Sequence, residues 1–150
     1  MQIEYREGNL LESGMMTIVH GCNSRGVMGS GIAKSIRSKW PEVYDRYKAA
    51  YDEVDGPLPL GCVVDSFAND GTRVLNAITQ DLYGRDGGVY VDYDAIRLCF
   101  KKINAQLGIW ISEIGMPQIG AGLGGGDWNK IATIIEQELT SIKPVVYIFR

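Results

Sequence analysis

The stretch IVHGCNSRGVMGSGIAK, from Ile18 to Lys34, has the order of a strand, a glycine loop and the start of a helix. An apolar run ends at Val19, glycines follow at positions 26, 29 and 31, and helical spacing begins at Ile32. Glycine lets the backbone approach a ligand closely, and a helix N-terminus offers free N–H groups and a positive dipole end. The stretch therefore predicts a phosphate-binding loop, with a simple tight turn as the alternative. It is neither a triphosphatase loop nor a complete GxGxxG.

A second glycine-rich segment, PQIGAGLGGG, occupies residues 117–126 and follows another apolar run. Asp127 comes directly after it and suits the N-cap of a helix. In layered α/β proteins, ligands bind beyond the carboxyl ends of the strands, and both glycine segments leave strands at such ends. Two glycine loops that face one crevice can hold a diphosphate between them.

The rest of the chain alternates strand and helix patterns. We expect strands over residues 2–6, 16–19, 62–67, 73–78, 109–116 and 144–149, and helices over 30–39, 41–51, 92–107 and 128–139. Helices interleaved with strands predict a layered α/β fold. Trp40, Trp110 and Trp128 are expected in the core. Residues 79–90 form a long connection without apolar periodicity, which is typical of a binding loop.

Composition limits the class of protein. The chain has 150 residues, enough for one domain, and a formal charge of −3, which gives no field that would gather nucleic acid. Its three cysteines lack metal-ligand spacing and indicate a reducing compartment. No signal-peptide core or membrane-spanning run is present. We expect a cytoplasmic monomer without metal, cofactor or membrane partner, and nucleic acid only as a modified substrate.

Five short motifs occur in order: Gly8-Asn9-Leu10-Leu11, Val19-His20-Gly21-Cys22-Asn23, Gly26-Val27-Met28-Gly29-Ser30-Gly31-Ile32-Ala33, Met116-Pro117-Gln118-Ile119-Gly120-Ala121-Gly122 and Asp127-Trp128. As a set they resemble the macrodomain family, which binds ADP-ribose. The chain is most similar to the branch of the yeast-type, phage and bacterial ADP-ribose-1''-phosphate phosphatases and the terminal ADP-ribose glutamate glycohydrolases. The resemblance implies a three-layer α/β/α macrodomain with a six-stranded mixed sheet over residues 1–150.

The resemblance also implies a set of ligand-binding residues. Asn9 stands where most macrodomains have an aspartate that accepts a hydrogen bond from adenine, and Asn23 where a residue orients the distal ribose. The two glycine loops would enclose the phosphates mainly through backbone N–H groups. The whole expected set is Asn9, Leu10, Gly21, Cys22, Asn23, Gly26, Val27, Met28, Gly29, Ser30, Gly31, Ile32, Gln80, Gln118, Gly120, Ala121, Gly122, Leu123, Gly124, Gly125 and Gly126.

Two residues are expected to be catalytic. His20, the one histidine of the chain, matches a histidine of the yeast-type phosphatases and could activate a water, or attack, at the 1''-phosphate. Its alternative is a structural ring that ends a strand. Asp127 matches an acidic residue of the glycohydrolases and could hold a water or a ribose hydroxyl, or could simply cap its helix. Cys22 is interpreted as packing, because nothing marks its thiol as activated.

One departure bears on function. The glycohydrolases carry a nucleophilic lysine after the fourth strand, where this chain has Gln80, and glutamine cannot form a Schiff base. Tyr83 and Tyr90 bracket the long loop and could stack on adenine or close over the ribose, but exposed tyrosines are common, so we assign them no role. The first hypothesis is therefore hydrolysis of ADP-ribose-1''-phosphate. The second is removal of ADP-ribose from protein or nucleic acid, or O-acyl-ADP-ribose deacylation. The third is a non-catalytic reader of ADP-ribose.

Overall fold

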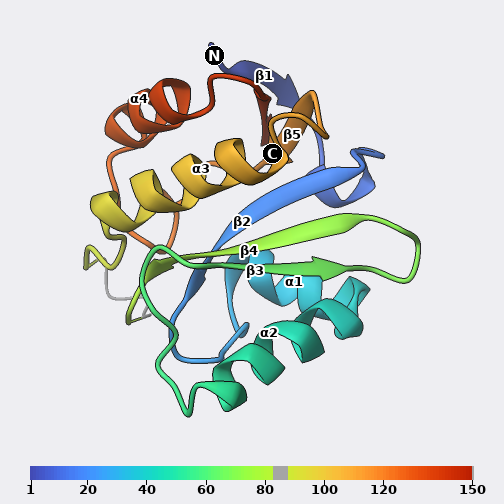
Figure 1. Cartoon of the computed structure of the whole chain (residues 1–150), viewed down its shortest axis with the longest axis vertical. Coiled ribbons are helices and arrows are strands. Elements are labelled where there is room, and N and C mark those ends of the chain that lie inside the picture. The colour runs from blue at the N-terminus through green and yellow to red at the C-terminus, as the bar shows by residue number, and fades with distance from the viewer. Residues whose placement is uncertain (83–87, 150) are drawn as a thin grey trace.

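The expected three-layer fold is confirmed. The computed structural model describes residues 1–82 and 88–149, and it has a mixed six-stranded sheet with helices on both faces (Figure 1). The strand order is β1-β6-β5-β2-β4-β3, and all neighbours are parallel except β3 and β4. The carboxyl ends of five parallel strands therefore meet at one edge of the sheet. No helix in the described ranges is both long and apolar enough to cross a membrane.

The strands span β1 (Glu4–Glu7), β2 (Thr17–Asn23), β3 (Val63–Phe67), β4 (Arg73–Gln80), β5 (Glu113–Met116) and β6 (Lys143–Ile148). Strand β2 is central and pairs along its length with β4, from Thr17 opposite Arg73 to Cys22 opposite Ile78. A register shift follows between Cys22 and Asn23. The strand thus runs four residues beyond the predicted end at Val19 and carries His20 into the sheet.

The helices form two layers (Figure 1). On one face lie α1 (Gly31–Lys39) and α2 (Pro41–Glu53), whose Ile36, Val43 and Tyr47 are fully buried. On the other lie α3 (Tyr93–Leu107) and α4 (Trp128–Glu138), which pack Ile96, Phe100 and other apolar side chains onto the sheet. A short 3-10 helix, η1 (Leu10–Glu12), follows β1. Apolar spacing at three to four residues explains each buried helix face.

The region before β5 differs from its prediction. Residues 109–112 are not strand, and Trp110 has 75% of its surface exposed, so its expected place in the core is wrong. The apolar run there begins in the turn that follows α3, where Trp110 N donates to Leu107 O. A short apolar run cannot by itself distinguish a turn from a buried strand. Trp40 is buried as expected, and Trp128 is partly buried.

Candidate functional site

The first glycine loop connects the end of β2 to the start of α1. Gly31 opens α1 with a φ of 59°, a left-handed conformation that favours glycine. Ser30 occupies the N-cap position but makes no side-chain cap, whereas Asn9, Asp92 and Asp127 cap their own helices. The N–H groups in the first turn of α1 are therefore not satisfied by a capping side chain, and a helix N-terminus of this kind favours an anion.

Both glycine loops border one cavity of about 470 Å³ at the carboxyl edge of the sheet. Its walls come from the ends of β2 and β4, the N-terminus of α1 and the segment after β5. The lining residues are Gly21, Cys22, Asn23, Val27, Gly29, Ser30, Gly31, Ile32, Ala33, Thr79, Gln80, Pro117, Gln118, Ile119, Gly120, Gly122, Leu123 and Gly124.

The chemistry of this cavity is that of backbone and neutral side chains. Among the lining residues that the structure describes there is no carboxylate, histidine, lysine or arginine. The polar side chains are Cys22, Asn23, Ser30, Thr79, Gln80 and Gln118. Burial raises the pKa of the Cys22 thiol well above its ordinary value, so this group is a neutral thiol. A cavity with helix N–H groups and no negative side chain suits a phosphate ligand.

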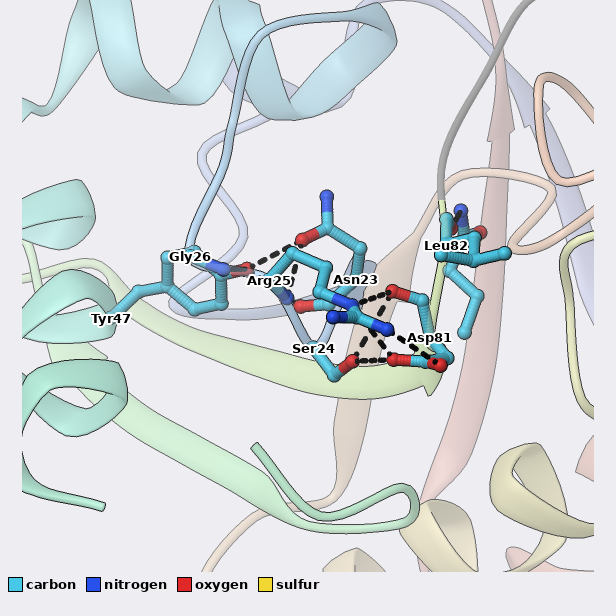
Figure 2. A network of polar contacts seen from close by, with 8 residues as sticks. Asn23, Ser24, Arg25, Gly26, Tyr47, Asp81 and Leu82 are labelled. Carbon is cyan, nitrogen blue, oxygen red and sulfur yellow. Dashed lines mark hydrogen bonds and ion pairs between the residues drawn. The ribbon is translucent and has the colours of Figure 1, made fainter. Parts of the chain in front are cut away.

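Side chains hold the first loop in shape. Asn23 Nδ2 donates to Val27 O at 2.8 Å, and Asn23 Oδ1 accepts from Arg25 N at 2.9 Å. Tyr47, from α2, donates its hydroxyl to Asn23 O at 2.6 Å and accepts from Gly26 N at 3.1 Å (Figure 2). Much of the Asn23 amide is thus engaged within the loop. Asn23 also lines the larger cavity, and the ribose contact expected from the sequence stays a prediction.

An ion pair links the same loop to the segment after β4. Arg25 Nε lies 3.0 Å from Asp81 Oδ1, and Ser24 Oγ donates to the same carboxylate at 2.5 Å (Figure 2). The hydrogen bond from Ser24, followed by that from Arg25, lowers the pKa of the Asp81 carboxyl. Gln80, beside it, donates Nε2 to Leu82 O at 2.7 Å. These contacts fix the ends of β2 and β4 relative to each other.

The second loop is held by main-chain bonds. Gly126 N donates to Gly120 O at 2.8 Å, and Gly124 O accepts from Tyr90 N at 2.8 Å and Val91 N at 3.1 Å. A Cβ on Gly124 would lie 2.7 Å from Gly120 O, which is too close for a side chain. This loop therefore requires glycine for its own packing as well as for access to a ligand.

A second cavity of about 360 Å³ continues from the first, with Ile32, Pro117 and Gln118 in both walls. Its other lining residues are Asn9, Leu10, Leu11, Ser35, Tyr147, Ile148 and Phe149. Most of these side chains are apolar or aromatic, so the second cavity suits a flat, largely apolar group. Together, the two cavities run along the sheet edge from β1 and β6 to β4.

A family model described as Macro domain matches residues 19–135. The chain belongs to this family. The match begins within β2 and includes both glycine loops and most of α4, so all residues that line the larger cavity lie in the part of the chain that the macrodomain model covers.

Relatives with assigned activities fall into two groups. A DNA ADP-ribosyl glycohydrolase of Mycobacterium tuberculosis is 28% identical over 97% of this macrodomain, which spans 42% of that protein. An ADP-ribose 1''-phosphate phosphatase of Candida glabrata is 24% identical, and the alignment covers 97% of both chains. A solved structure from Bacteroides thetaiotaomicron, described as a protein of unknown function, has a TM-score of 0.86 and 30% identity over 98% of each chain.

His20, the expected catalytic residue of this macrodomain, does not line the cavity. Its side chain is fully buried in the sheet, Nε2 lies 2.7 Å from Asn76 Oδ1, and Cys22 Sγ lies 3.4 Å from Nε2. Desolvation lowers the pKa of His20 to about 4, so the ring is neutral at physiological pH. Asn76 in turn donates Nδ2 to Ser66 Oγ and Val64 O. This geometry gives no support to direct attack by the imidazole on a ligand.

Asp127 also lies outside both sets of lining residues. Its Oδ1 accepts from Asn129 N at 2.9 Å, and its own N–H donates to Tyr93 Oη at 3.0 Å. Asp127 is therefore the N-cap of α4, as the simpler interpretation of the sequence held.

Asn9 lines the second cavity, and its side-chain oxygen also caps η1. Oδ1 accepts from Leu11 N at 3.0 Å and caps η1. Because a backbone N–H needs an acceptor, this bond leaves Nδ2, a donor, as the other polar atom of the amide. Because an amide oxygen has two lone pairs, Oδ1 can accept from Leu11 N and still accept a second hydrogen bond, and the adenine contact expected of Asn9 stays a prediction.

The remaining expected ligand residues separate into two classes. Those that line a cavity include Leu10, Gly21, Gly29, Gln80 and Leu123. Five do not line either cavity: Gly26, Met28, Ala121, Gly125 and Gly126. Met28 is buried in the core, and Gly26 packs against the Tyr51 ring, which a Cβ would approach to 2.9 Å. Tyr83 lies outside the described residues.

Some wall residues had no expected role. Thr79 was expected only as the first residue of the long connection, but it precedes Gln80 at the end of β4, so the connection begins two residues later than predicted. Tyr147, Ile148 and Phe149 come from the end of the last strand. Their position at carboxyl ends of parallel strands was the available signal. In the described part of the chain, no cluster of three or more His, Cys, Asp or Glu side chains could hold a metal ion.

Proposed function

We propose that this macrodomain binds ADP-ribose along its two connected cavities and hydrolyses ADP-ribose-1''-phosphate to ADP-ribose and phosphate. The observation that carries the binding proposal is the larger cavity, which has two glycine loops, an α1 N-terminus with no side-chain cap, and no carboxylate among its described lining residues. The diphosphate would lie between the loops. The base would enter the second cavity, where apolar side chains predominate.

Two observations support the phosphatase reaction. A Candida glabrata ADP-ribose 1''-phosphate phosphatase is 24% identical to this chain, and Gln80 stands where the glycohydrolases are expected to carry a nucleophilic lysine. Backbone N–H groups of the glycine loops would stabilise the charge on the phosphoryl oxygens during attack by water. A positioned general base contributes roughly 10²–10⁴-fold to such reactions. Because no charged base lines the described cavity walls, we expect slow turnover.

The test offers two substrates to the same protein. Calorimetry with ADP-ribose comes first, followed by product assays with ADP-ribose-1''-phosphate and with an ADP-ribosylated oligonucleotide. We expect binding heat and phosphate release from the first substrate. Binding without release of any product from either substrate would support a reader of ADP-ribose. No binding heat at all would contradict the whole proposal.

Glycohydrolysis is the second candidate, because the mycobacterial DNA ADP-ribosyl glycohydrolase has the higher identity, 28%. Release of ADP-ribose from the oligonucleotide would support it. Gln80, which lines the cavity, cannot form a covalent adduct as a lysine can, so this reaction would have to use water.

His20 and Asp127 enter the proposal as supports of β2 and α4 rather than as groups that touch substrate. Their variants test this directly. We expect His20→Gln and Asp127→Asn to keep phosphate release within about threefold once folding is matched. A folded His20→Gln that binds ADP-ribose normally but has lost turnover would instead assign the chemistry to the imidazole.

A further inference from the structure

The Thr79 hydroxyl at the end of β4 has no hydrogen-bond partner. Thr79 is fully buried, and its Oγ1 is the one buried side-chain oxygen or nitrogen in the described residues that lacks a partner. Buried hydroxyls are nearly always paired, and leaving one unpaired costs about 1–3 kcal/mol. Valine has almost the same shape without this cost. An unpaired hydroxyl in a cavity wall therefore calls for an explanation other than packing.

Thr79 is part of the cavity wall, and its hydroxyl lies against the backbone of β2. Thr79 lines the larger cavity between Gly21 and Ile119. A Cβ on Gly21 would lie 2.8 Å from Thr79 Oγ1 and 3.2 Å from Ile119 Cγ2, so the hydroxyl can lie this close to β2 because position 21 is glycine. The main chain of Thr79 is fixed, because its carbonyl accepts from Asp92 N at 2.8 Å. Rotation about the Cα–Cβ bond can move Oγ1 without moving the backbone.

The sheet order shows which end of a ligand Thr79 would meet. The second cavity lies at the ends of β1 and β6, the shared wall of Pro117 and Gln118 follows β5, and Thr79 ends β4 on the far side of β2. A ligand with its base in the second cavity and its diphosphate between the loops therefore places its distal sugar near Thr79. This placement rests on the proposed function.

We propose that the Thr79 hydroxyl hydrogen-bonds a hydroxyl of the distal ribose and thereby positions the 1'' carbon of the ligand. A threonine hydroxyl is both donor and acceptor, as is a sugar hydroxyl, so the pair is chemically matched. Ligand binding satisfies the oxygen that is unpaired in the free protein. The role is that of a ligand contact that orients the sugar, and it requires no ionised group.

Two variants test this contact by calorimetry with ADP-ribose and by thermal melting without ligand. Thr79→Val should raise the Kd about five- to tenfold, because one neutral hydrogen bond is lost. The same variant should melt at the wild-type temperature or above it, because it removes an unpaired buried hydroxyl. Thr79→Ser keeps the hydroxyl and should keep the Kd within about twofold of wild type. Thr17→Val is the matched control. Thr17 begins β2, at the end of the strand away from the cavity, so this variant should bind ADP-ribose normally.

A structural role predicts a different pattern. If Thr79 only packs the wall, Thr79→Val would bind as wild type, and this result would overturn the inference. Loss of both stability and affinity in Thr79→Val would also overturn it. A crystal of the wild-type protein with ADP-ribose gives a second measurement that depends on no variant, and a distance above about 4 Å from Oγ1 to every ribose oxygen would exclude the bond. Absence of ADP-ribose binding by the wild type would instead refute the proposed function.

Discussion

The two glycine loops border the same cavity but are held in different ways. The first loop, residues 24–30, depends on side chains from elsewhere in the chain, namely the Tyr47 hydroxyl and the Asp81 carboxylate. The second loop, residues 120–126, is held by its own main chain and by that of Tyr90 and Val91. The two loops are therefore similar in composition but depend on different interactions. The first loop should be sensitive to loss of a polar group, and the second to an added Cβ.

The strands that precede the two loops also differ. β2 carries His20 and Cys22 into a buried polar network with Asn76 and Ser66. The second loop follows β5, where Ile114 and Met116 are fully buried apolar residues. β2 therefore carries buried titratable side chains, whereas β5 carries none.

The largest predicted effect is the response of stability to pH through His20. Its pKa is about 4 in the folded protein, against an ordinary value of 6.5. Between these values the unfolded chain takes up a proton and the folded chain does not, so stability falls as pH is lowered from 6.5 to 4. The shift corresponds to about 3 kcal/mol at the lower limit, and above pH 6.5 the group contributes no slope.

Urea unfolding at intervals between pH 7 and pH 4 measures this slope, and His20→Gln is the control. Glutamine can still bond to Asn76 but does not titrate in this range, so the difference between the two slopes isolates the imidazole. Identical slopes in both proteins would mean that His20 is as accessible to protons in the fold as in the unfolded chain. That result would remove this difference between β2 and β5.

The second loop should be sensitive to a methyl group at a single position. Gly124→Ala would place Cβ 2.7 Å from Gly120 O, and backbone cannot yield as a side chain can. We expect a loss of about 2 kcal/mol in the free energy of unfolding and at least tenfold weaker ADP-ribose binding. Gly122→Ala is the matched control, because its Cβ would meet nothing within 4 Å. Melting temperatures that fall equally in both variants would contradict this view of the loop.

Much of this arrangement could be predicted from sequence, for local reasons. Apolar periodicity identified all four helices and, to within a few residues, most strands, and glycine spacing identified both loops at carboxyl ends of strands. Family membership was also predictable, because the motifs occur in a fixed order along the chain.

The placement of side chains was less predictable. His20 was expected beside the ligand from its match to a histidine of the yeast-type phosphatases, but β2 is buried on both faces, so its pattern does not indicate which face meets the ligand. Asn23 was expected to contact ribose, and no feature of the sequence indicated that its amide also bonds to Val27, Arg25 and Tyr47. Thr79 and Phe149 become wall residues only because strands distant in sequence end side by side.

A smaller effect is predicted for the tyrosine that supports the first loop. Tyr47→Phe removes the hydroxyl that donates to Asn23 O and accepts from Gly26 N. Two backbone groups would lose a partner, so we expect a loss of about 1.5 kcal/mol in the free energy of unfolding. Tyr44→Phe is the control, because its hydroxyl makes one longer bond, 3.3 Å to Gly26 O. Chemical denaturation of the two variants measures the difference, and equal losses would show that the loop does not depend on Tyr47.

The smallest effect is predicted for the ion pair between Arg25 and Asp81. Their side chains have 42% and 47% of their surface exposed, and exposed pairs contribute little because water and salt screen them. Asp81→Asn keeps an acceptor for Ser24, so the melting temperature should fall by less than about 2 °C and the ADP-ribose Kd should change by less than about twofold. A large loss of affinity that disappears at high salt would show that the charge itself shapes the cavity. The first loop would then be held by electrostatics as well as by the Tyr47 hydrogen bonds.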